Sequence, residues 1–160
     1  MSSHPAPQQI QQQIQQQVQE LIQTAPTYGI PAKTMQQIAP LFAALASKLR
    51  HLQYFIVQSL EHSWLTTTLQ HGTSDLTKTV IYAYPSLEVA KVRESSESQG
   101  VALPVPTVAI LFQLLALPVD SLIFVESADA QTQTEISRSG LNQMLEQYLR
   151  SLISLPSDIA

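Results

Sequence analysis

The apolar positions near the start of the chain recur every fourth residue within a tract of glutamine. Ten of the sixteen residues from Gln8 to Gln23 are glutamine. The residues that carry the apolar repeat are Ile10, Ile14, Val18 and Ile22. This spacing predicts a helix over about Pro7 to Gln23, with one apolar stripe on an amide surface. Because an isolated helix of that length is marginal in water, we expect it to dock on its own domain or on another subunit.

Glycine and two prolines interrupt the helical pattern between Thr27 and Pro31, which predicts a hinge. Apolar residues from Met35 to Leu49 then return to helical spacing, and Pro40 either kinks this second helix or starts it afresh. Near the other end of the chain, residues 139–154 carry a broad apolar face at the same spacing. They predict the most regular helix of the chain, which Pro156 ends.

The middle of the chain contains the candidate strands. Residues 52–62 fit either a helix or a strand, and the aromatic and β-branched run Tyr54–Val57 favours a strand. Trp64 to Leu69, with three threonines, is the expected hairpin partner of that strand. The other predicted strands are Thr77 to Tyr84, Ser121 to Glu126 and Thr132 to Ile136.

Three segments lie between these strands. A short helix from Ser86 to Arg93 can use Ser86 as its cap. Glu94 to Gly100 is polar and predicts a loop. Thr107 to Leu117 is apolar nearly all round and predicts a buried helix. The strand, helix and strand between Thr77 and Glu126 leave enough chain for a crossover connection.

The order of these elements predicts an α+β protein. We expect a two-layer sandwich, in which a mainly antiparallel sheet of four or five strands carries helices on one face, with the N-terminal Gln-rich helix in addition. The expected division is a Gln-rich helical extension and hinge at 1–30, a single α+β domain at 31–156 and a tail at 157–160. The helix at 107–117 should pack with the last helix against one face of the strands. The other residues expected in that contact are Leu145, Leu149, Leu152, Val80, Tyr82, Ile123 and Val125.

The composition narrows the class of protein. Apolar residues make up 44% of the 160 positions and charged residues 12%, so a core can form while the surface relies on neutral polar groups. A net charge of −4 without any basic run argues against a nucleic-acid partner. Three prolines interrupt the charge-free stretch from Ser98 to Val119, so we do not expect a membrane span. The chain has no cysteine and no visible secretory signal, which suits a cytoplasmic location.

The sequence contains no motif that predicts catalysis, a cofactor or a metal. Its four glycines lie at least 28 residues apart, so they cannot form a glycine-rich phosphate loop. The absence of cysteine excludes thiolate metal sites and cysteine nucleophiles. Titratable groups gather around Trp64 at Glu61, His62 and His71, where we expect solvated turn residues and not a metal site.

These observations favour a non-catalytic protein–protein interaction or assembly module. The Gln-rich helix would be its oligomerisation or partner-docking element, with either a protein partner or a second copy of the chain. The predicted partner-binding residues are Ile10, Ile14, Val18, Ile22 and Trp64. The alternative is a small enzyme or ligand-binding domain, with a pocket near Glu61, His62 and His71.

Overall fold

The computed structural model describes residues 7–70, 72–73, 75–93 and 100–154. The α-helices in these ranges are α1 (Pro7–Thr24), α2 (Ala32–Ser47), α3 (Leu87–Arg93), α4 (Thr107–Leu114) and α5 (Arg138–Ser154), and a short 3-10 helix, η1 (Ala25–Tyr28), follows α1. The strands are β1 (Gln53–Ser59), β2 (Thr67–Gln70), β3 (Thr77–Ala83), β4 (Gly100–Pro106), β5 (Ser121–Val125) and β6 (Gln133–Ser137). Of the polar loop predicted at 94–100, residues 94–99 lie outside the described residues and Gly100 is the first residue of β4.

The described strands form two sheets. Four strands lie in the order β2-β3-β5-β6, in which β3 and β5 run parallel and the outer pairs run antiparallel. β1 and β4 pair as an antiparallel ribbon. Phe55 and Tyr84 exchange backbone hydrogen bonds of 2.7 and 2.9 Å, which join this ribbon to the chain just beyond β3. The predicted α+β fold, with a largely antiparallel pairing of strands and an N-terminal helix, is confirmed, with the strands divided between two sheets.

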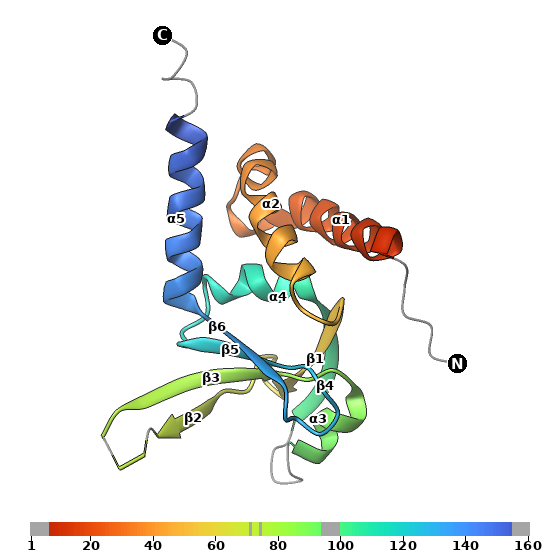
Figure 1. Cartoon of the computed structure of the whole chain (residues 1–160), viewed down its shortest axis with the longest axis vertical. Coiled ribbons are helices and arrows are strands. Elements are labelled where there is room, and N and C mark those ends of the chain that lie inside the picture. The colour runs from red at the N-terminus through yellow and green to blue at the C-terminus, as the bar shows by residue number, and fades with distance from the viewer. Residues whose placement is uncertain (1–6, 71, 74, 94–99, 155–160) are drawn as a thin grey trace.

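A crossover connection joins the parallel strands β3 and β5. The chain between them passes through α3, β4 and α4. This connection is long enough to place β5 parallel to β3 in the same sheet. β5 is buried along its whole length, as expected for a strand that is covered on both faces. The connection expected between Thr77 and Glu126 is therefore present, and it places α4 over the sheet (Figure 1).

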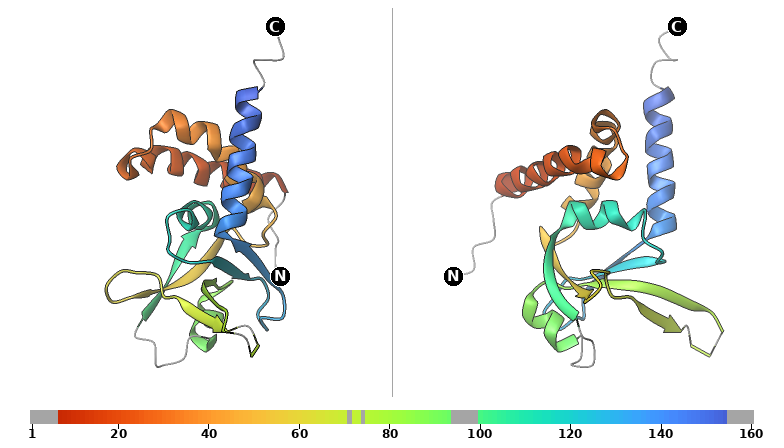
Figure 2. Two further views of the ribbon diagram at one scale, coloured as in Figure 1. Left: turned by 90° about the vertical axis from the view of Figure 1, so that its left-hand side faces the viewer. Right: turned by 180° about the vertical axis from the view of Figure 1, so that it is seen from behind.

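Four helices, α1, α2, α4 and α5, pack in two tiers on one side of the four-stranded sheet, whereas α3 packs against β1 and β4 on the other side (Figures 1 and 2). α4 lies next to the sheet, and α1 and α2 lie on the far side of α4. α5 leaves the end of β6 and rises beside α2. One core runs through both tiers and includes Ile14, Val18, Met35, Phe42, Ile81, Leu111, Phe124 and Leu141. Because α1 contributes to this core, residues 7–30 share it with the residues that follow.

One glutamine of α1 has a specific structural role. Gln17 donates from Nε2 to the backbone carbonyl of Leu52 at 2.8 Å. Its Oε1 accepts a hydrogen bond from the backbone N–H of Val108 at 3.1 Å. Val108 lies in the first turn of α4, where Pro106 provides no side-chain cap. Gln17 therefore satisfies a backbone donor that a helix N-terminus leaves without an intrahelical partner, and it ties α1 to α4.

The face of the strands that packs against the helices is not the predicted face but the opposite one. Ile81, Ala83, Leu122 and Phe124 belong to the core shared with the helices. The predicted set, which was Val80, Tyr82, Ile123 and Val125, alternates with them and therefore faces the other side of the sheet. Both sets are apolar because the strands are covered on both sides, so alternation alone does not identify the inner face. In α5 Leu141 is fully buried, whereas the predicted contact Leu149 is exposed.

The predicted hairpin of β1 with residues 64–69 forms only at the residue pairs closest to its turn. Trp64 forms an isolated antiparallel bridge with Gln58, and Leu65 N–H donates to the carbonyl of Val57 at 2.9 Å. β2 then begins at Thr67 and pairs with β3. The long partner of β1 is β4, which the sequence pattern did not predict because two prolines interrupt it.

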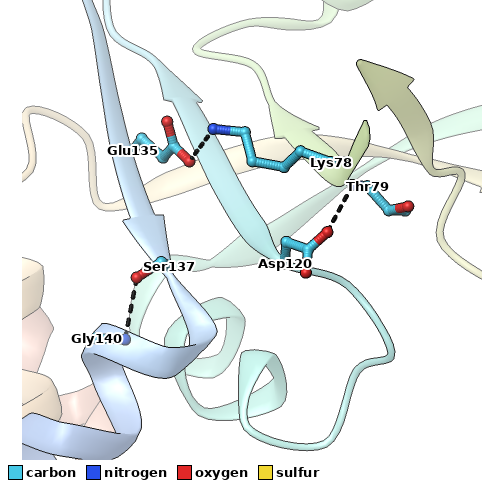
Figure 3. A network of polar contacts seen from close by, with 6 residues as sticks. All are labelled: Lys78, Thr79, Asp120, Glu135, Ser137 and Gly140. Carbon is cyan, nitrogen blue, oxygen red and sulfur yellow. Dashed lines mark hydrogen bonds and ion pairs between the residues drawn. The ribbon is translucent and has the colours of Figure 1, made fainter. Parts of the chain in front are cut away.

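Polar contacts fix the start of α5 at one end of the sheet (Figure 3). Thr79 N–H donates to the carboxylate of Asp120 at 2.8 Å, and Asp120 N–H donates to the carbonyl of Thr79 at 2.8 Å. The carbonyl of Asp120 accepts a hydrogen bond from Arg138 N–H at 2.8 Å. Ser137 Oγ caps α5 by accepting from Gly140 N–H at 3.0 Å. These contacts join β3, the residue before β5 and the first turn of α5.

Candidate interaction surface

The apolar stripe of α1 is covered by its own chain. Ile14, Val18 and Ile22 are at most 9% exposed and lie in the core shared with α2 and α4. Ile10 is half-buried and packs at the edge of that core. The stripe was expected to dock either on its own domain or on another subunit, and in this structure it docks on its own domain. Ile14, Val18 and Ile22 are therefore not exposed to a partner, in contrast to their predicted role.

Trp64, the remaining predicted contact residue, lies partly at the surface. It is half-buried, and it packs against the main core. Its bridge partner Gln58 pairs on the other side with Val101 of β4. Because residues paired across antiparallel strands project from the same face, Trp64, Gln58 and Val101 form one row.

Leu103 extends this row into an apolar surface. It pairs with Ile56, two residues before Gln58, and so projects from the same face as Val101. Val101 is 54% exposed and Leu103 is 41% exposed, whereas Ile56, paired with Leu103 on the neighbouring strand, is buried in the main core. We call Trp64, Val101 and Leu103 the Trp64 surface. This surface carries no charged side chain, and the segments that carry it pack against the core.

Proline limits the free edge of β4 beside this surface. The backbone N–H and C=O of Phe55 bond to Tyr84, so they point away from β4. Pro104 is paired with Phe55, and its backbone N and C=O therefore point away from β1, toward the free edge. Pro106 lies two residues further on in the same orientation. Proline has no N–H, so both positions lack a donor for an added strand, and a partner would contact the side-chain face of the ribbon instead.

The pocket suggested near Glu61, His62 and His71 is only partly covered by the described residues. Glu61 and His62 are exposed in the turn after β1, and His71 lies outside the described residues. His62 has a left-handed backbone, with a φ of 67°, and its Nδ1 lies 3.1 Å from Nε2 of Gln58. Within the described ranges, no three His, Asp or Glu side chains come together to hold a metal ion.

The structure brings together a buried polar cluster that no pattern in the sequence predicts. Glu126 is 5% exposed, and the hydroxyl of Tyr54 donates to its Oε1. Its Oε2 accepts from the backbone N–H of Arg50 at 3.2 Å and from Thr134 Oγ1 at 3.4 Å. His51 Nε2 lies 3.1 Å from the carbonyl of Glu126. Desolvation by burial, with the hydrogen bond to Glu126 as a further cause, holds the pKa of Tyr54 well above its ordinary value.

This cluster, which we call the Tyr54–Glu126 clasp, connects distant parts of the chain. Tyr54 and Glu126 are 72 residues apart, and no local periodicity or motif links them. The carboxylate of Glu126 accepts hydrogen bonds from three donors. These bonds offset the free-energy cost of removing a carboxylate from water. A cavity of about 570 Å³ lies beside it and is lined in part by Ile10, Leu49 and Leu52. The clasp therefore fixes the loop before β1 to the end of β5.

The sheet face that points away from α4 carries an ion pair. Lys78 Nζ lies 2.7 Å from Glu135 Oε2, joining β3 to β6 across β5 (Figure 3). The hydrogen bond from Lys78, and a second one with Ser121, lower the pKa of Glu135. Both charged side chains are about two-fifths exposed, at 43% and 40%, so solvent screens the pair and its contribution to stability is small.

Comparison with protein-family models, with curated proteins and with solved structures gives no match to this chain. Among the helices of the described residues, none combines the length and the apolar character needed to cross a membrane. The candidate surface therefore rests on the geometry of this chain alone.

Proposed function

We propose that this chain is a non-catalytic protein–protein interaction module that contacts its partner through the Trp64 surface. The observation that carries the proposal is the Trp64 surface, in which Val101 and Leu103 are 54% and 41% exposed and the half-buried Trp64 lies on the other side of Gln58. Tryptophan is enriched among the residues that dominate binding energy at interfaces. Strands held by a core also present such side chains with little loss of conformational entropy on binding.

In this proposal the Gln-rich helix has a structural part. Its apolar stripe completes the core, and its exposed glutamines form an almost uncharged outer surface. Partner docking is assigned to the ribbon because its apolar side chains are accessible, whereas those of the stripe are buried. A protein partner, a cytoplasmic location and the absence of a nucleic-acid partner are parts of the same proposal, supported by the net charge of −4 and the lack of cysteine.

The proposal can be tested by photo-crosslinking in the cells from which the chain derives. A photoreactive amino acid replaces Leu103, and in a second version of the full chain it replaces Val92. Val92 is 81% exposed on α3. α3 packs on the opposite face of the ribbon, where Val89 and Ala90 contact Val57 and Ala102. The two positions therefore differ in face while both are exposed and apolar.

We expect a crosslinked product of defined mass from position 103 and not from position 92. The substitution Val101→Ser should reduce its yield at least about fivefold, as expected when an interface residue contributes about 1 kcal/mol. Val92→Ser, the same chemical change on the other face, should leave the yield unchanged. A product containing two copies of the chain would identify the partner as a second copy. Equal products from both positions, or none from position 103, would contradict the proposal.

A further inference from the structure

A pocket of about 380 Å³ lies on the face of the four-stranded sheet that points away from α4. Its volume is within the range of small-molecule sites. The residues that line it include Thr67, Tyr82, Tyr84, Arg93, Val125 and Gln133. They come from β2, β3, β5 and β6, from the residue after β3 and from the last residue of α3, so secondary structure on several sides holds the pocket in place.

One wall of this pocket is aromatic. The rings of Tyr82 and Tyr84 are nearly parallel, with an angle of 19° between their planes and 6.0 Å between their centroids. Tyr82 is half-buried, and Val125 beside it is buried. A flat, partly accessible aromatic surface next to an aliphatic side chain suits a planar ring of a ligand, because offset stacking adds to the burial of apolar area.

The charged group in the lining is the cation Arg93. Its Nη2 donates to the backbone carbonyl of Asp129 at 3.2 Å, which holds the guanidinium near the pocket and leaves its other N–H donors for a ligand. The carboxylate of Asp129 is engaged elsewhere, with Ser127 Oγ at 2.6 Å and Gln131 N–H at 3.0 Å. Hence the guanidinium is held by a carbonyl, and it makes no direct ion pair with a carboxylate of the described residues, although it is near enough to Asp129 to contribute to the lowered pKa of that carboxyl.

Two hydroxyl groups add further donors. Within the described part of the chain, the hydroxyls of Thr67 and Tyr82 make no hydrogen bond. Gln133 donates from Nε2 to the carbonyl of Ala130 at 3.2 Å, which fixes the orientation of its amide. The pocket thus combines an aromatic wall, two uncommitted hydroxyls and a positioned guanidinium, in a protein whose net charge is −4.

We propose that this pocket binds a small aromatic anion, with the ring of the ligand against Tyr82 and its carboxylate or phosphate at Arg93. The guanidinium offers paired N–H donors to either type of anion. Thr67 and Tyr82 would donate from their hydroxyls to the remaining oxygens. This site lies on a different strand face from the Trp64 surface, and its test does not depend on the proposed protein partner.

The test is a titration of the full chain followed by NMR, with phenyl phosphate, benzoate and benzyl alcohol as probes. The two anions should give saturable shifts centred on the lining residues. Benzyl alcohol, which has the ring without the charge, should bind at least about tenfold more weakly, because a charge-assisted hydrogen bond contributes about 1.5–3 kcal/mol. The stronger of the two anions identifies the ligand as a phosphate or a carboxylate.

Two variants of α3 separate the pocket from general surface charge. Arg93→Gln should weaken the binding of the stronger anion about tenfold or more, on the same basis. Lys91→Gln removes one positive charge from an exposed position on the same helix and should leave binding within about twofold, because screened charges outside the site contribute little. Equal losses in both variants, equal binding of benzyl alcohol, or no saturable shift with either anion would overturn the proposal.

Discussion

At the scale of single residues, Gln17 differs from the nine other glutamines between residues 8 and 23. Those nine are exposed, whereas Gln17 is half-buried and makes two long-range hydrogen bonds to backbone groups. A buried backbone group without a partner is costly, so the amide of Gln17 is worth more to the fold than its neighbours are. The repeat of glutamine in the sequence hides this difference, because it arises only when α4 and the loop at Leu52 approach α1.

Substitution of Gln17 tests this difference. Gln17→Ala should lower the free energy of unfolding by about 1–3 kcal/mol, since the carbonyl of Leu52 and the N–H of Val108 both lose a partner. Gln16→Ala, on the exposed side of the same helix, should change it by less than about 0.5 kcal/mol. Chemical denaturation followed by circular dichroism measures both values. Equal unfolding midpoints for the two variants would show that the two hydrogen bonds of Gln17 contribute nothing to stability.

At the scale of elements, α1 and β4 illustrate two different relations between pattern and structure. The four-residue repeat of α1 is local, and it predicts the helix found at Pro7–Thr24. β4 shows the reverse, because Pro104 and Pro106 argue against a strand unless their nitrogens face a free edge, as they do here. Whether an edge is free depends on the other strands, so no local rule could have assigned β4.

Removal of α1 tests its part in the core. A variant that begins at Thr27 would expose the apolar side chains of α2 and α4 that now contact Ile14, Val18 and Leu21. We expect this variant to unfold or aggregate, because the lost contacts are worth about 1.5–3 kcal/mol for each large buried side chain and total stabilities are only about 5–15 kcal/mol. Circular dichroism and light scattering measure the outcome. A folded monomer with the thermal midpoint of the full chain would show that α1 is a separate extension.

At the scale of the whole molecule, the contacts that hold the tiers together join residues far apart in the sequence. The Tyr54–Glu126 clasp fixes the loop between α2 and β1 to the end of β5. The ring of Tyr54 also packs edge-on against Phe124, with centroids 4.9 Å apart, inside the main core. Ionisation of Tyr54 is therefore coupled to global unfolding.

This coupling predicts a loss of stability at alkaline pH. In the folded chain, burial and the hydrogen bond to Glu126 raise the pKa of Tyr54, so the neutral form is retained there, whereas the unfolded chain ionises near the ordinary value of 10.0. The stabilisation is fully present below pH 10 and is lost progressively as the pH rises above it. Denaturation midpoints between about pH 8 and pH 11 measure the slope.

Tyr54→Phe is the control for this prediction. It removes the titrating hydroxyl and should flatten the fall in stability above pH 10. It should also lower stability at neutral pH by about 1–3 kcal/mol, because the buried carboxylate of Glu126 loses a donor. If the variant and the parent show the same slope at alkaline pH, Tyr54 is not the group responsible.

The sequence by itself determined the elements whose signals are local. The apolar periodicities of α1 and α5, the β-branched runs of β3 and β5, and the cap in which Ser86 Oγ accepts from Val89 N–H at 3.2 Å all depend on residues a few positions apart. The role of Trp64 as a contact residue stays a prediction, made from its chemical type and its neighbourhood. These features follow from backbone geometry and solvent exposure, which short segments already specify.

Only the tertiary structure decided what covers each apolar face. The stripe of α1 could have met another subunit, and it meets α2 and α4 instead. Val101 and Leu103 join Trp64 only because β4 pairs with β1, and the inner face of β3 is set by the position of α4. The physical reason is that burial is non-directional and depends on which surfaces the path of the chain brings together, so the same apolar pattern is compatible with a core, an interface or a pocket wall.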